Sequence, residues 1–177
     1  DSNFVNEHFD FKMRTLSGQE KNDPRWKQVL NELKSDFDDA IGKLYVDNYF
    51  SPEAKKRAFE MAKNIKSALA ERISNADWMC DSTKVKALRK LENCRLKIGY
   101  PDNHWVDYTN FVMGDSYATN IITCLAEYFK YEMSFIDMNI KPDLWYEILP
   151  STANMYYVYN QNEIVVPAAM LQLPMFY

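Results

Sequence analysis

Residues 154–167 read NMYYVYNQNEIVVP. Two runs of β-forming residues, 155–159 and 164–166, flank the polar pair Asn160 and Gln161, which is typical of a β-hairpin. Asn160 can adopt the positive φ angle that a tight turn requires, so we expect the turn there. An isolated hairpin is only marginally stable in water. The sequence therefore predicts that this hairpin belongs to a sheet that the chain does not complete.

The residues before the hairpin carry helical signals. An Asp-Pro start followed by apolar residues at helical spacing predicts one long helix over 24–49, and a Ser-Pro start predicts another over 52–73. Asp81 begins a third, which we expect to continue until Gly99 supplies a left-handed residue and Pro101 prevents further helix. A fourth apolar stripe predicts a helix over 116–135, and an earlier, weaker one predicts a helix over 4–11.

These elements predict a mainly α chain, with a multi-helix portion over residues 1–150 and the hairpin within 151–177. The chain begins at Asp1 without an initiator Met or a signal-peptide pattern, so we expect the natural N-terminus to lie upstream. We interpret the chain as a piece of a larger protein. Such a piece should expose apolar side chains whose partners lie elsewhere: Val165, Met170, Leu171, Leu173 and Phe176.

Composition excludes several classes of protein. The 177 residues include 21 basic and 25 acidic side chains, a formal net charge of −4, which argues against nucleic acid as a partner. No apolar run approaches the ~18 residues of a membrane helix, so we expect no membrane insertion by this stretch. Three scattered cysteines favour buried free thiols, although a bond between Cys94 and Cys124 stays geometrically possible.

Charged and metal-binding candidates are weak in the sequence. The two histidines, His8 and His104, lack the one-turn spacing that lets two imidazoles reach one metal, so we predict no metal bound by this stretch. Asp36, Asp38 and Asp39 lack the glycine and distal glutamate of a calcium loop, and we interpret them as a solvated helix face. The basic residues of 84–97 are interpreted as outer surface in the same way.

Asn154 is the most suggestive polar residue, because it enters the first strand of the hairpin with a carboxamide that can both donate and accept. An exposed sheet edge can bind an extended peptide as an added strand. The alternative is that Asn154 merely begins a strand. From the pattern of residues alone, both interpretations stay open.

Six short strings, in order, carry a family resemblance. They are PRWK at 24–27, GKLYV at 42–46, DWM at 77–79, KIGYP at 97–101, NMYY at 154–157 and NEIVVPA at 162–168. Together they resemble the neprilysin family of zinc metalloendopeptidases, particularly its bacterial oligopeptidase branch. Each string alone is weak, but six in the correct order along nearly the whole chain are specific.

The resemblance implies a two-lobed enzyme in which a helical lobe caps a thermolysin-like α+β catalytic lobe around an internal chamber. Residues 1–150 would then be a portion of the capping lobe, and 151–177 the first strands of the catalytic lobe, which the remainder of that lobe completes. In the family an Asn-Ala-aromatic-Tyr strand lies along the peptide substrate. The resemblance implies that Asn154 binds the substrate through its side chain, Met155 through its backbone, and that Tyr156 lies near a substrate side chain.

The family's chemistry uses zinc held by two histidines of an H-E-x-x-H motif and a downstream glutamate. This sequence contains no such motif, and the family's zinc helix would begin shortly after Tyr177. The resemblance therefore implies a zinc enzyme for the parent polypeptide and no catalytic residue or hydrolysis in this stretch. It also favours a periplasmic or extracellular location over the cytoplasm.

The alternative function is a non-catalytic helical module that keeps the capping architecture in order to bind a peptide or protein. It predicts peptide affinity that is independent of zinc. The two hypotheses differ in whether H-E-x-x-H follows in the natural reading frame.

Overall fold

The computed structural model describes residues 2–103, 105–139, 144–145 and 149–176. The chain forms two compact units, residues 1–37 and 38–177. The first contains the helix α1 (Ser2–His8), the π-helix η1 (Phe9–Leu16) and the helix α2 (Arg25–Asp36). This confirms a helix near residues 4–11, and Phe9 is its buried residue.

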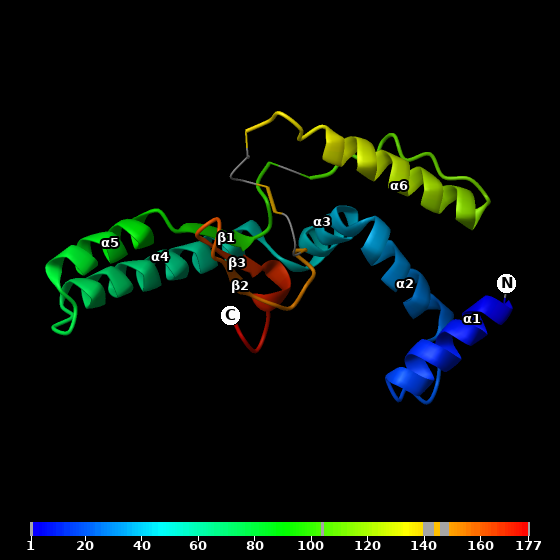
Figure 1. The fold of residues 1–177 in the computed structure, drawn as a ribbon, viewed down its shortest axis with the longest axis horizontal. Coiled ribbons are helices and arrows are strands. Elements are labelled where there is room, and N and C mark those ends of the chain that lie inside the picture. Colours follow the sequence, from blue (N-terminus) through cyan, green and yellow to red (C-terminus); the bar gives the residue numbers. More distant parts are fainter. Residues whose placement is uncertain (1, 104, 140–143, 146–148, 177) are drawn as a thin grey trace. The chain divides into compact units, whose positions relative to one another are not determined.

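The second unit holds the remaining elements, labelled in Figure 1. Its helices are α3 (Asp38–Tyr49), α4 (Pro52–Ser74), α5 (Asp81–Glu92) and α6 (Tyr117–Met133), and its strands are β1 (Arg95–Gly99), β2 (Tyr156–Val158) and β3 (Glu163–Pro167), followed by the short 3-10 helix η2 (Ala168–Met170). The mainly α class with a small sheet is thus confirmed.

Serine caps mark the starts of two helices, α4 and α6. Ser51 accepts a hydrogen bond from the Ala54 N–H, with Pro52 in the first turn of α4, and Ser116 accepts one from the Thr119 N–H at the start of α6. Each serine oxygen satisfies a backbone donor that has no partner within the helix. The predicted starts of these two helices are confirmed.

The single helix predicted over 24–49 is wrong. Phe37 has φ −133° and ψ 43°, outside the helical range, and it separates α2 from α3. The residues around it are polar and short, and the Asp38 carboxylate accepts the Asp39 N–H at 2.7 Å. Such side chains compete with the helix for backbone hydrogen bonds, which explains a break where the apolar spacing alone continues.

The third helix is shorter than predicted. It ends at Glu92, and residues 95–99 form β1, which pairs in parallel with β3 from Arg95 opposite Glu163 to Gly99 opposite Pro167. Strands β2 and β3 pair antiparallel, giving the order β1-β3-β2. The hairpin is confirmed, and the chain itself supplies a third strand. The remainder of any larger sheet would lie beyond these three strands.

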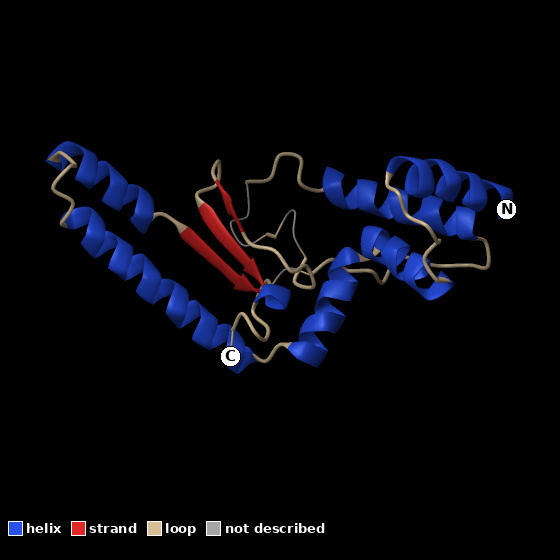
Figure 2. Ribbon diagram, turned by 90° about the horizontal axis from the view of Figure 1, so that it is seen from below, coloured by secondary structure: helices blue, strands red, loops and turns tan. Residues whose placement is uncertain are grey.

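The two faces of this sheet differ. Because paired residues share a face and neighbours alternate, Leu96, Ile98 and Val166 lie on an apolar face, which packs with Ala58 of α4. Figure 2 shows α4 as the long helix beside the strands. Arg95, Lys97, Glu163 and Val165 lie on the opposite side, which we call the charged face.

Gly99 ends β1 at a place where a side chain would not fit. Its φ is +80°, as the sequence predicted for a left-handed residue, and an added Cβ would lie 2.7 Å from Phe50 Cε1. The hairpin turn differs from its prediction, since the positive φ of 54° belongs to Asn162 and not to Asn160. Asn162 is held by hydrogen bonds from its Nδ2 to Lys90 O and from the Tyr157 hydroxyl to its Oδ1.

The predicted exposure of apolar side chains near the C-terminus is wrong for two of five residues. Val165 and Leu171 are buried, Met170 and Phe176 are partly buried, and Leu173 is 72% exposed. Val165 is covered on the charged face, and Leu171 joins the core around Phe50 and Ala58.

The cysteines are all free thiols, with Cys94 and Cys124 buried and Cys80 exposed.

Candidate functional site

The edge strand β2 is the candidate binding element. It pairs with β3 on one side, and no described strand pairs with its other side. An unpaired strand edge offers backbone N–H and C=O groups to an extended peptide. The three predicted site residues are consecutive, so Asn154 and Met155 lead directly into Tyr156, the first residue of β2.

Asn154 is exposed and makes local hydrogen bonds. Its Oδ1 accepts from the Met155 N–H at 2.8 Å, and its own N–H donates to Thr152 O at 3.0 Å. The carboxamide oxygen is therefore occupied, whereas the Nδ2 group has no hydrogen-bond partner among the described residues. In this arrangement Asn154 can donate to a carbonyl of a bound peptide.

Met155 and Tyr156 differ in exposure. The Met155 side chain is half exposed, and Tyr156 is partly buried opposite Val165 in the register of β2 with β3. The Met155 N–H is used by Asn154, which leaves its carbonyl as the backbone group for a ligand. Asn154, Met155 and Tyr156 therefore lie in a row at the start of the edge strand.

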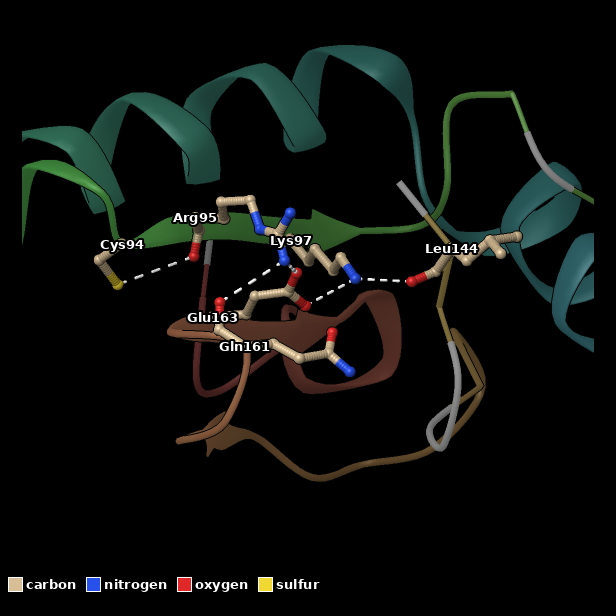
Figure 3. Close-up of polar contacts among 6 residues, drawn as sticks. All are labelled: Cys94, Arg95, Lys97, Leu144, Gln161 and Glu163. Carbon is tan, nitrogen blue, oxygen red and sulfur yellow. Dashed lines mark hydrogen bonds and ion pairs between the residues drawn. The ribbon is translucent and has the colours of Figure 1, made fainter. Parts of the chain in front are cut away.

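A buried charge cluster lies beside this strand (Figure 3). Glu163 is 1% exposed, and its Oε2 lies 2.6 Å from Lys97 Nζ, while its Oε1 contacts the Arg95 guanidinium. Lys97 also donates to Leu144 O at 2.6 Å. The cluster joins β1, β3 and the segment at residue 144 through charge-assisted bonds.

This cluster corrects the outer-surface interpretation of the basic residues of 84–97 for Lys97, whereas Lys86, Arg89 and Lys90 are exposed as predicted. Lys97 is 9% exposed and belongs to the interior, because a strand that alternates basic and apolar residues presents two different faces. Sequence reasoning also missed Glu163. The available signal was a carboxylate among β-formers, two residues before a buried valine on the same face.

A second polar cluster joins α3, α6 and the loop near residue 108. The hydroxyls of Tyr108 and Tyr128 lie 2.9 Å apart, and they donate to Asp38 Oδ1 at 3.3 Å and 3.1 Å. Asp39 Oδ2 accepts the Val106 N–H at 2.9 Å. The interpretation of Asp38 and Asp39 as a solvated face is therefore wrong, since both are partly buried and hydrogen-bonded.

Burial changes the acidity of this second cluster. It raises the pKa of Tyr108 to about 12, and it raises the pKa of Tyr128 above its ordinary value near 10. Burial likewise raises the pKa of Asp39, an effect that the Val106 hydrogen bond partly offsets. Removing a charged form from water disfavours that form, so all three groups hold their protons more tightly than in water.

No group of three His, Cys, Asp or Glu side chains is placed to hold a metal ion within the part of the chain that the structure describes. His8 is exposed in α1, and His104 lies outside the described residues. Among the same residues, no helix is both long and apolar enough to cross a membrane.

Comparison with known proteins defines the class. The sequence model of peptidase family M13 matches residues 1–101, which is more than half of the chain. The chain therefore belongs to peptidase family M13, the neprilysin family of zinc metalloendopeptidases.

Particular relatives cover almost the whole chain. It is 29% identical over 172 residues to membrane metallo-endopeptidase-like 1 of Mus musculus, a match that spans 92% of this chain and 22% of that protein. It is 30% identical over 164 residues to endothelin-converting enzyme 1 of Homo sapiens, spanning 86% and 21% respectively. The chain thus spans about a fifth of the curated relatives it matches.

Solved structures agree in fold. The zinc metalloprotease Zmp1 of Mycobacterium tuberculosis, in complex with an inhibitor, aligns with a TM-score of 0.87 and 36% identity over 99% of this chain and 26% of that one. PepO from Lactobacillus rhamnosis aligns with a TM-score of 0.82 and 28% identity, over 93% and 26%. The expected family is confirmed by both kinds of relative.

Proposed function

We propose that the natural polypeptide containing these residues is a zinc-dependent endopeptidase that hydrolyses short peptides, and that this stretch supplies a substrate-binding edge strand. The observation that carries the proposal is the open edge of β2, with Asn154 and Met155 just before it, in a chain of a metallopeptidase family.

Strand geometry supports the proposed peptide binding. A substrate lying antiparallel or parallel to residues 154–156 would receive a hydrogen bond from Asn154 Nδ2 and would donate one to the Met155 carbonyl. Backbone pairing supplies affinity regardless of peptide sequence, whereas the side chains beside the strand select among peptides. Met155 and Tyr156 would therefore influence which side chains are accepted.

Zinc chemistry would come from other parts of the polypeptide. The described residues hold no cluster of metal-binding side chains, and the sequence has no H-E-x-x-H motif, so these residues do not fit a zinc site. In this proposal zinc activates water elsewhere, and the present residues hold the peptide. The stretch by itself would not hydrolyse peptides.

The remaining parts of the proposal concern architecture and location. Residues 1–150 would belong to the helical capping lobe, with α3 and α4 contributing to the wall of the chamber, and residues 151–177 would be the first strands of the catalytic lobe. The chamber would limit substrates to peptides small enough to enter. The enzyme would act in the periplasm or outside the cell, which fractionation of the native host tests.

Replacing Asn154 tests the binding role. In the full-length enzyme we expect Asn154→Ala to lower kcat/KM for a short peptide by about 5- to 150-fold, which corresponds to the roughly 1–3 kcal/mol lost with one buried hydrogen-bond partner. Asn110→Ala, which changes an exposed asparagine of the same unit, is the matched control and should retain full turnover.

Two outcomes would contradict the proposal. Unchanged kcat/KM in Asn154→Ala would remove the role of this residue. A full-length protein that binds peptides equally well with and without a zinc chelator, and never cleaves them, would favour the non-catalytic module.

A further inference from the structure

The charged face of the sheet contains a pocket of about 60 Å³ beside β2. Glu163 and Lys97 contribute the charged part of its lining, Tyr156 and Val158 contribute the side of the edge strand, and Asn160 and Gln161 contribute the turn. The pocket therefore lies between a buried ion pair and the hairpin turn.

One oxygen in this lining lacks a hydrogen bond. Glu163 is 1% exposed, and its Oε2 is paired with Lys97. Its Oε1 is in ionic contact with Arg95, yet no donor among the described residues is aligned to form a hydrogen bond with it. A buried carboxylate oxygen is costly to leave in this state, because it has lost its hydration without full replacement.

Charge and volume select the occupant. Lys97, Arg95 and Glu163 together carry a net positive charge, so a further cation would be repelled. Glu163 Oε1 needs a hydrogen-bond donor, which a simple anion cannot supply. A water molecule is neutral, can donate to Oε1 and can accept from a lining carboxamide. The pocket exceeds the roughly 10–15 Å³ of free space that one water molecule needs in a cavity, and buried waters need two to four polar partners.

We propose that this pocket is an internal hydration site, in which one or two water molecules donate to Glu163 Oε1 and bridge it to the hairpin turn at Asn160 or Gln161. The water completes the hydrogen bonding of the buried carboxylate and ties β3 to the turn that ends β2. The site does not depend on peptidase activity, so it stands or fails separately from the proposed function.

A crystal structure of the natural polypeptide, at a resolution that shows ordered water inside the protein, tests the proposal. We expect a density peak at about 2.7–3.0 Å from Glu163 Oε1 with at least one further polar partner. An empty pocket overturns the proposal, as does a pocket filled by side chains, or a peak with the short, many-ligand coordination of a metal ion.

Two variants at one lining position give a matched comparison. Val158→Met places a longer side chain in the pocket and should remove the peak, whereas Val158→Ala should retain it. Counting long-lived internal waters by oxygen-17 relaxation in solution should show a loss of one or two in Val158→Met alone. Equal counts in the wild type and both variants would overturn the proposal, and the wild-type map decides it even if Val158→Met does not fold.

Discussion

Two clusters in the second unit bury carboxylates by different means. Glu163 on the charged face is neutralised by the cations Lys97 and Arg95. Asp38, between α3 and α6, is instead approached by the neutral hydroxyls of Tyr108 and Tyr128. The first cluster relies on ion pairing inside a sheet, and the second on hydrogen bonds between helices.

The two clusters should differ in how much stability is lost when one interacting side chain is removed. A buried charge without its counter-charge is strongly unfavourable, whereas a hydrogen bond from a neutral group contributes about 1 kcal/mol net. Substitutions in the sheet cluster should therefore affect the free energy of unfolding more than substitutions in the helix cluster. The stability contributed by Asp39, Tyr108 and Tyr128 should depend on pH, because burial has raised their pKa values.

Removing the Glu163 side chain should cause the largest loss of stability. Glu163→Ala leaves Lys97 buried without its partner, so we expect the free energy of unfolding to fall by about 3–5 kcal/mol. Urea denaturation followed by circular dichroism measures the loss.

A double variant and a surface control make this prediction specific. Combining Glu163→Leu with Lys97→Met removes both charges and should restore part of the stability, because an apolar pair of similar volume can replace a buried ion pair. Glu60→Ala breaks the exposed pair with Lys63 and should change stability by less than about 0.5 kcal/mol. Equal losses in Glu163→Ala and Glu60→Ala would show that the sheet cluster contributes little.

A smaller loss is expected in the helix cluster. Tyr128→Phe keeps the ring contacts with Tyr108 and Phe111 but removes the hydroxyl that donates to Asp38 Oδ1. We expect a loss of about 1–2 kcal/mol in the same urea experiment. Tyr159→Phe is the control, because the Tyr159 side chain is 83% exposed, and a loss as large as that of Tyr128→Phe would contradict this account.

The contrast between the clusters also shows how far the sequence could predict the structure. Local signals were sufficient for α4 and α6, where serine caps fix the starts, and for the two strands of the hairpin. They failed at β1, because its partner β3 lies more than sixty residues further along the chain and the basic residues of 95–97 resemble a helix surface. Pairing between distant segments leaves little trace in local periodicity.

The site was predictable to a similar degree. The six strings in order, of which those at 154–157 and 162–168 are the last two, indicated the family. The edge position of β2 suits the roles expected for Asn154 and Met155, which remain predictions. The buried pair of Lys97 and Glu163 could not be predicted from spacing, because each residue looks exposed until the strands are brought together. The turn residue shifted from Asn160 to Asn162 because the register of the two strands, and not residue type, decides which residue takes the positive φ.

Alkaline titration separates the helix cluster from exposed tyrosines. The folded-state pKa of Tyr108 is about 12, above its unfolded value near 10. The folded protein therefore binds more protons in this window, and stability falls as pH rises from about 10 towards 12. Absorbance at alkaline pH should show late-ionising tyrosines that include Tyr108 and Tyr128, with one fewer in Tyr108→Phe, whereas Tyr159→Phe should leave their number unchanged.

We expect the smallest effect on stability at Asp39, and we expect it at acidic pH. Burial raises its folded-state pKa, so its contribution to stability is fully present below its unfolded pKa and is lost as pH rises through the folded value. Asp39→Asn keeps an oxygen that accepts the Val106 N–H and abolishes the titration. The difference in unfolding free energy between wild type and Asp39→Asn should therefore favour the wild type most in acid and decline as pH rises above about 4.

Asp47→Asn, at an exposed ion pair with Lys43, serves as the control for general charge effects. A difference that instead grows with pH would mean that the Asp39 carboxylate is stabilised in its charged form, as in an ion pair, and the distinction between the two clusters would then not hold.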